Sequence, residues 1–239
     1  NIGHPMLFAQ TYIGTKRIIE NYVEEMSECL RYLASSECIT FQLKEKIQFF
    51  KECQRAYGQP ALMFSGGATL GLFHTGVCKA LLEQDLMPRV LSGSSAGAIM
   101  TGMLGVSSAD KIPELLKGEH FFSDAFKFRK ISELIRGHGG IADVMYLKKF
   151  LMQNLGDVTF AEAYQQSKRH INIVIAPYNT AQNPRIMNAL TAPNVLVWSA
   201  VLASCAVPVL FPPVHLTSKR YDGQHTPYLA NTKWVDGSM

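Results

Sequence analysis

The order of apolar and glycine-rich segments in the first half of the chain constrains the fold more than any other feature of the sequence. A short apolar run at 61–64 ends in a glycine loop, and a helical pattern of apolar residues follows over 70–86. A second short run at 89–91 ends in a turn, and a helix of small residues is expected over 96–104. Strands that alternate with helices in this way run parallel, because each helix carries the chain back along the sheet. We therefore expect an α/β domain with a mostly parallel central sheet.

Further helices and strands are expected along the rest of the chain. The helical patterns lie at 143–155, 159–168 and 195–206, and the strand patterns lie at 171–176, at 185–190 and just before Gly237. Thr159 and Glu162 have the spacing of a capping box, which predicts that a helix begins directly after Thr159.

Residues 1–58 have a different pattern and are predicted to form a helical hairpin. Apolar residues recur every three or four positions from 18 to 33, which is typical of an amphipathic helix. A second helix is expected from near Thr40, which can serve as its N-cap, to Gly58. We therefore expect a boundary between a helical region at 1–58 and an α/β domain at 61–239.

Composition excludes several classes of protein. Of the 239 residues, 47% are hydrophobic and 18% are charged, which excludes an extended disordered chain. The net charge of +4 is too small to indicate a nucleic-acid partner. The five cysteines form no C-x-x-C pair, so the sequence indicates neither a disulfide framework nor a metal site, and reduced intracellular thiols are expected. The longest apolar stretch, 195–211, is shorter than the roughly 20 residues of a membrane span and is expected to form core.

The segment Gly93-Ser94-Ser95-Ala96-Gly97 places a serine at the turn from an expected strand into an expected helix. This G-x-S-x-G pattern is typical of a nucleophile elbow, in which small flanking residues let a sharp turn close. The following helix points its N-terminal N–H groups at the serine and at an oxyanion formed during acyl transfer. The alternative is a turn of small residues that only packs a helix on a sheet. Ser95 is therefore the candidate nucleophile, and Gly93 and Gly97 are the candidate elbow glycines.

A glycine loop that contains Gly66, Gly67 and Ala68 follows the first expected strand. Consecutive glycines let backbone N–H groups turn outward and bind an anion, either the phosphates of a nucleotide or the oxyanion of acyl transfer. The sequence lacks a G-K-[ST] motif, and the loop departs from G-x-G-x-x-G, which disfavours a nucleotide. Because the loop precedes a nucleophile elbow, we expect it to form an oxyanion hole.

A nucleophilic serine needs a base, and the residues leave two options open. Asp157 followed by His215 or His225 has the Ser, Asp, His order of α/β-hydrolase triads. Asp236, at the end of an expected strand and followed by a glycine, is placed to approach Ser95 without a histidine. An Asp-Gly pair by itself is more often a turn.

Together these motifs resemble the patatin-like phospholipase family. The resemblance rests on the glycine loop, the elbow, the late Asp-Gly pair and the residues His74, Gly76 and Val77. Within the family, the segment 190–195, the prolines between 208 and 213, Trp198 and Trp234 are similar to those of intracellular triacylglycerol lipases of yeasts and plants, the sugar-dependent lipase type. The resemblance covers nearly the whole chain.

The resemblance implies a three-layer α/β/α fold and a catalytic dyad of Ser95 and Asp236. The implied oxyanion hole consists of backbone N–H groups of Gly66, Gly67 and Ala68. Two positions depart from the family pattern, because Ala68 stands where many members have a third glycine and Leu70 stands where many have Arg or Lys.

The same resemblance implies domain roles and an activity. Residues 1–58 correspond to the end of an upstream lipase-associated domain, and 61–239 to a catalytic domain that is cut short at its C-terminus. The implied activity is hydrolysis of a lipid acyl ester, most of all triacylglycerol, without a cofactor, at an intracellular lipid droplet or membrane surface. The alternatives are a phospholipase or lysophospholipid acyltransferase at the same site and a catalytically silent lipid-binding protein. Mixed aromatic and basic residues over 121–130 are a further candidate for lipid contact.

Overall fold

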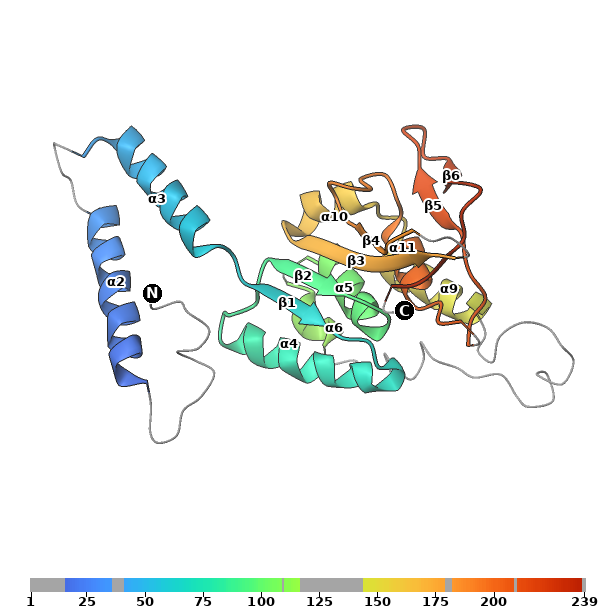
Figure 1. Cartoon of the computed structure of the whole chain (residues 1–239), viewed down its shortest axis with the longest axis horizontal. Coiled ribbons are helices and arrows are strands. Elements are labelled where there is room, and N and C mark those ends of the chain that lie inside the picture. The colour runs from blue at the N-terminus through green and yellow to red at the C-terminus, as the bar shows by residue number, and fades with distance from the viewer. Residues whose placement is uncertain are drawn as a thin grey trace, which may run out of the picture. The chain divides into compact units, whose positions relative to one another are not determined.

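The computed structural model describes residues 16–35, 41–108, 110–116, 144–178, 182–208 and 210–237 (Figure 1). The chain divides into two compact units, Asn1–Gly58 and Gln59–Met239.

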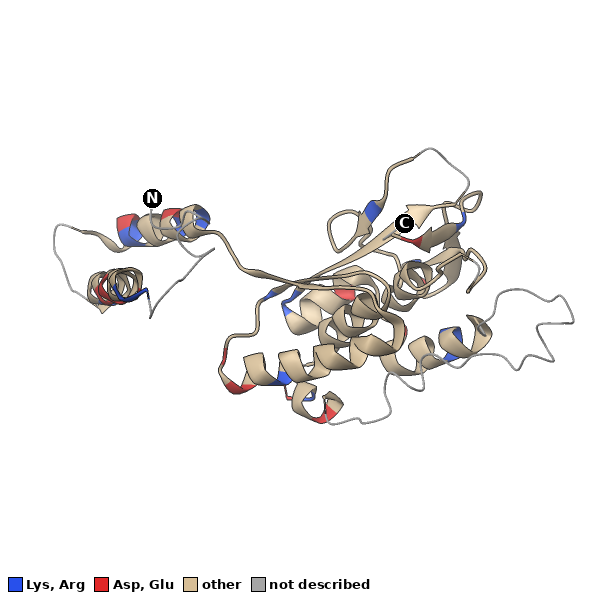
Figure 2. Cartoon of the chain, turned by 60° about the horizontal axis from the view of Figure 1, so that its bottom comes forward, with Lys and Arg blue, Asp and Glu red and all other residues tan. Residues whose placement is uncertain are grey.

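The described residues of the first unit form two helices, as the periodicity predicted. Helix α2 spans Arg17–Ser35 and α3 spans Leu43–Tyr57, and neither has a buried residue. Acidic and basic side chains both occur on each helix (Figure 2). Helix α3 begins after Gln42, which forms a capping box with Glu45, whereas the expected N-cap Thr40 lies outside the described residues. The predicted end of the second helix at Gly58 is confirmed, because Gly58 has a φ of 74° that favours glycine.

The second unit is built on a five-stranded sheet. Its strands are β1 (Ala61–Phe64), β2 (Val90–Gly93), β3 (His170–Pro177), β4 (Arg185–Met187) and β7 (Trp234–Asp236). Strands β1, β2 and β3 are parallel neighbours, and both β4 and β7 pair antiparallel with β3. Ile175 of β3 pairs with Arg185 of β4 on one edge and with Asp236 of β7 on the other. Strands β2 and β7 both pair with the edge of β3 that faces away from β4. Strand β7 therefore lies in line with β2, just beyond the C-terminal end of β2.

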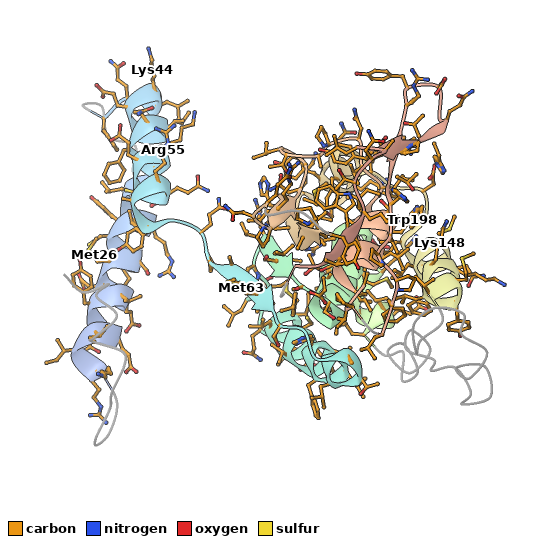
Figure 3. All side chains as sticks on the ribbon, turned by 45° about the vertical axis from the view of Figure 1, so that its right-hand side comes forward. Met26, Lys44, Arg55, Met63, Lys148 and Trp198 are labelled. Carbon is orange, nitrogen blue, oxygen red and sulfur yellow. The ribbon has the colours of Figure 1, made fainter. Side chains whose placement is uncertain are left out.

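The helices of this unit pack against the sheet and against one another. Those in the described residues are η1 (Ala68–Leu72), α4 (Phe73–Glu83), α5 (Ala96–Val106), α6 (Ile112–Leu115), α9 (Val144–Leu155), α10 (Phe160–Ser167) and α11 (Val197–Ser204). Helices α5 and α11 contact each other and both contact β3 (Figure 1). The ammonium of Lys148 in α9 lies 5.3 Å from the ring centre of Trp198 in α11 (Figure 3). The predicted α/β class, with a mostly parallel sheet flanked by helices, is confirmed.

The strands alternate between a buried and a more exposed face. Phe64, Leu91 and Ile173 are at most 4% exposed and belong to the core, whereas Met63 on the opposite face of β1 is 77% exposed (Figure 3). The apolar stretch that begins at Val195 forms α11, all of whose residues are buried. This confirms that it is core, and no helix among the described residues is long and apolar enough to cross a bilayer.

Two elements differ from the sequence expectation. The helix expected over 70–86 begins as the 3₁₀ helix η1 at Ala68 and ends at Glu83. A separate antiparallel pair, β5 (Leu216–Lys219) and β6 (His225–Tyr228), was not predicted. Its strands are short and largely polar, so they lack the apolar run that identifies β1 and β3.

The predicted capping box of α10 is confirmed, and it is linked to β5 by an ion pair. The Thr159 hydroxyl accepts a hydrogen bond from the Glu162 N–H at 3.2 Å, and the Glu162 carboxylate accepts one from the Thr159 N–H at 2.8 Å. The Lys219 ammonium lies 2.8 Å from the same carboxylate. Burial raises the pKa of Glu162, but the contacts with Lys219 and Thr159 outweigh it, so the pKa lies below its ordinary value.

We expect Glu162→Gln to lower thermal stability at pH 7 by only about 1–3 °C, because the pair is partly exposed. Since folding lowers the pKa of Glu162, this contribution is present above the ordinary pKa of a glutamate side chain and is lost as the pH falls through the lower folded-state pKa. Melting temperatures of the two proteins between pH 7 and pH 3 should therefore converge at the acidic end. Glu114→Gln, at an exposed position of α6, is the control. A difference between parent and Glu162→Gln that persists at pH 3 would contradict the assignment.

Candidate active site

Ser95 occupies a strained turn between β2 and α5. It is the N-cap residue of α5, with φ 54° and ψ −123°. A non-glycine residue in such a sparsely populated region costs roughly 1–3 kcal/mol and persists only where the surrounding structure enforces it. The residue is 8% exposed. The predicted strand–turn–helix setting of Ser95 is thus present, with the backbone strain that a nucleophile elbow requires.

The two elbow glycines lie where the chain segments approach too closely for a side chain. A Cβ at Gly93 would lie 2.2 Å from the carbonyl oxygen of Gly97, and a Cβ at Gly97 would lie 2.2 Å from the carbonyl oxygen of Phe64. The Ser94 N–H also donates to the Phe64 carbonyl at 3.4 Å. Gly97 therefore lets the first turn of α5 pack directly on the end of β1.

The glycine loop after β1 passes directly against Ser95. A Cβ at Gly66 would lie 3.2 Å from the Cβ of Ser95 and 3.9 Å from its Oγ. Gly67 has φ 148° and Ala68 has φ 49°, so both residues adopt conformations that favour glycine. The loop that carries the predicted oxyanion-hole residues is therefore adjacent to the predicted nucleophile.

His74 contacts the residues at the start of this loop. Its Nε2 lies 2.9 Å from the carbonyl oxygen of Ser65, and its ring packs edge-on against Phe64 at 5.2 Å between centroids. A residue of α4 thus holds the loop that precedes its own helix.

Asp236 reaches the elbow from β7. It is fully buried, and its Oδ1 accepts a hydrogen bond from the Ser94 hydroxyl at 3.0 Å. Its backbone N–H donates to the Ala206 carbonyl at 3.2 Å. A Cβ at the next residue, Gly237, would lie 2.6 Å from the backbone carbon of Val174, so the glycine lets β7 lie close to β3. The carboxylate thus contacts the residue immediately before the candidate nucleophile.

The histidine alternative occupies a different environment. His225 Nε2 lies 2.7 Å from Asp157 Oδ1, with the two side chains 41% and 53% exposed. Asp157 also pairs with Lys219 at 3.7 Å and lines a polar hollow. Neither Ser95 nor Asp236 lines that hollow. The Asp157–His225 pair is part of this ionic cluster, whereas the contacts of Ser95 come from the glycine loop and from α11.

Residues 62–239 match the model of the patatin-like phospholipase family, and residues 1–55 match a domain of unknown function, DUF3336. The chain belongs to the patatin-like phospholipase family. It is 38% identical to triacylglycerol lipase 4 of Saccharomyces cerevisiae, over 100% of this chain and 28% of that protein. It is 33% identical to triacylglycerol lipase ptl2 of Schizosaccharomyces pombe, over 100% of this chain and 38% of that protein. The chain therefore spans about a third of the length of these relatives.

The chain can also be aligned with a solved structure. VipD from Legionella pneumophila aligns with 76% of this chain and 46% of its own, at 15% identity and a TM-score of 0.46.

The thiol of Cys205 lies beside the candidate nucleophile. The Cys205 Sγ donates to the Ser95 carbonyl at 3.3 Å. Burial, and secondarily the charge of Asp236, raise the pKa of Cys205 well above its ordinary value. The group is therefore a neutral hydrogen-bond donor at physiological pH.

Three contacts in this patatin-like site were not anticipated from sequence. Ser94 stands at a variable position of the G-x-S-x-G pattern, and Ser204 and Cys205 lie in a segment whose pattern predicts only an apolar helix. The adjacent serines at 94 and 95 were the one available signal, since a small polar residue beside a nucleophile is placed to contact its base. The aromatic and basic segment 121–130 lies outside the described residues. Among the residues that the structure does describe, no cluster of His, Cys, Asp and Glu could hold a metal ion.

Proposed function

We propose that this protein is a serine hydrolase of lipid acyl esters whose main substrate is triacylglycerol. The proposal is supported by one arrangement: the Gly66 loop lies against the strained turn at Ser95, and the buried Asp236 carboxylate contacts Ser94, the residue before it. The names of the two yeast relatives, both triacylglycerol lipases, support the choice of substrate. Leu70, Phe73 and Val77, in the two helices that follow the glycine loop, are 65%, 72% and 48% exposed, which suits an enzyme that works at the surface of a lipid droplet or membrane.

In the proposed reaction, Asp236 takes the proton from the Ser95 hydroxyl as its oxygen attacks the ester carbonyl. Backbone N–H groups of Gly66, Gly67 and Ala68, with the N-terminal end of α5, stabilise the oxyanion. The intermediate collapses to an acyl-serine, and the departing diacylglycerol oxygen takes the proton from Asp236. Water then attacks the acyl-serine while Asp236 accepts one of its protons. Asp236 returns that proton to the Ser95 oxygen as the fatty acid leaves, which regenerates the free enzyme.

Covalent labelling of the full chain with a fluorophosphonate tests this proposal. We expect a single labelled peptide that carries the probe on Ser95. The unlabelled protein should hydrolyse a triacylglycerol emulsion faster than phosphatidylcholine vesicles, and labelling of Ser95 should abolish both activities. Faster release of fatty acid from the vesicles would identify a phospholipase, and acyl transfer to added lysophospholipid would identify an acyltransferase. Absence of label in a folded protein would overturn the hydrolase assignment in favour of a silent lipid-binding protein.

A further inference from the structure

Three consecutive residues at the C-terminal end of α11 contact both members of the proposed dyad. The Ser95 N–H donates to the Ser204 hydroxyl at 3.0 Å, and the Cys205 thiol donates to the Ser95 carbonyl at 3.3 Å. The Asp236 N–H donates to the Ala206 carbonyl at 3.2 Å. The nucleophile and the base are therefore attached, through their backbones, to the same short segment.

Ser204 makes the most specific of these contacts. Its side chain is fully buried, and its hydroxyl accepts from Ser95 while donating to the carbonyl oxygen of Val174 at 2.7 Å. Val174 directly precedes Ile175, the residue of β3 that pairs with Asp236. A hydroxyl has one proton to donate and lone pairs to accept, and Ser204 uses both functions here. One side chain thus links the elbow to the strand that holds β7.

The hydrogen bond from Ser95 to Ser204 involves a residue whose backbone is strained. Ser95 has a positive φ of 54°, and such strain is retained only when surrounding contacts hold it. Loss of the Ser204 hydroxyl leaves a buried N–H at Ser95 without this acceptor, and the strained turn without one of its restraints. Since acyl transfer depends on placement of the reacting atoms to within about 1 Å, a small relaxation of the turn lowers the rate.

We propose that Ser204 is a positioning residue. Its hydroxyl holds the backbone of Ser95 in its reactive conformation and fixes its position relative to Asp236. The inference rests on the proposed function of Ser95 and Asp236. Ser204 touches no substrate in this scheme and acts only through the main chain of the nucleophile.

Ser199 provides a matched control on the same helix. It is also fully buried, and its hydroxyl accepts from the Thr217 N–H at 3.1 Å and donates to the Leu196 carbonyl at 2.9 Å. Ser199→Ala and Ser204→Ala therefore remove the same group from equally buried sites with similar backbone partners. Only the second variant disturbs the dyad.

The test compares these variants in the full chain by fluorophosphonate labelling and by hydrolysis of a soluble short-chain ester. For Ser204→Ala we expect kcat and the labelling rate to fall on the order of 10- to 100-fold, with KM little changed. Ser199→Ala should lose similar thermal stability yet keep its kcat. Ser204→Cys, which offers a weaker hydrogen-bonding thiol, should lie between parent and Ser204→Ala, and it supplies the test if Ser204→Ala does not fold.

The outcomes separate this inference from the proposed function. A parent protein that is not labelled at Ser95 overturns the proposed function and the inference with it. A labelled parent with unchanged kcat in Ser204→Ala or in folded Ser204→Cys overturns the inference alone. Equal losses of kcat in Ser204→Ala and Ser199→Ala also overturn it, because they would reflect general destabilisation of α11.

Discussion

Replacement of Asp236 by asparagine should lower the rate of acylation of Ser95 by roughly 10²- to 10⁴-fold while leaving the domain folded. The amide has the shape of the carboxylate and its oxygen can still accept the hydrogen bond of the Ser94 hydroxyl at Oδ1. It cannot take the proton of Ser95, so the loss is chemical. Because the position is fully buried, a neutral group there also avoids the cost of desolvating a charge, and the melting temperature should not fall.

The measurement is the rate of fluorophosphonate labelling beside the melting curve of each variant, with Ser95→Ala as background. Asp157→Asn is the matched control, since it neutralises the carboxylate that pairs with His225. We expect the control to label at the parental rate. In the opposite pattern, Asp157→Asn would not be labelled and Asp236→Asn would be labelled at the parental rate. That result would assign the base to a histidine and refute the Ser–Asp dyad.

The sequence predicts those features of the fold and of the site that depend on residues close together in the chain. The elbow is recognised because its small residues are needed within one turn, where Gly93 and Gly97 contact backbone atoms. The start of α10 is recognised because Thr159 and Glu162 cap each other three residues apart. In both cases the interacting groups belong to the same short segment, so their spacing alone carries the information.

Other parts of the site depend on contacts between distant segments and could not be read from spacing. Ser94 and Asp236 are 142 residues apart, and Ser95 and Ser204 are 109 residues apart. The sequence of α11 does not distinguish Ser204 from Ser199, because each is a serine among apolar residues of the same helix. Their roles differ only because the sheet register places Val174 and Ser95 next to one of them. The sequence motifs therefore predict the candidate reactive residues, whereas the residues that hold them in place are found only from the fold.

We expect Gly97→Ala to destabilise the catalytic unit by about 3 kcal/mol or more and to abolish labelling of Ser95. An alanine Cβ would lie 2.2 Å from the carbonyl oxygen of Phe64 and 2.6 Å from its carbon, and backbone atoms at the end of a strand cannot move aside cheaply. The first turn of α5 would have to move away from β1. That movement would also separate Ser95 from the Gly66 loop, which is reached from the same end of β1.

Gly76→Ala is the control that isolates this steric effect. Gly76 is also within a helix, α4, but a Cβ there would meet no atom within 4 Å. Alanine is a better helix former than glycine by about 1 kcal/mol, so the control should be slightly more stable than the parent and equally active. Urea unfolding and fluorophosphonate labelling of both variants provide the comparison. Helix propensity alone would make both substitutions stabilising, so opposite signs for the two changes in unfolding free energy would demonstrate that close packing of α5 on β1 determines the geometry of the nucleophile. Parental stability in Gly97→Ala would show that the two elements do not approach as closely as described.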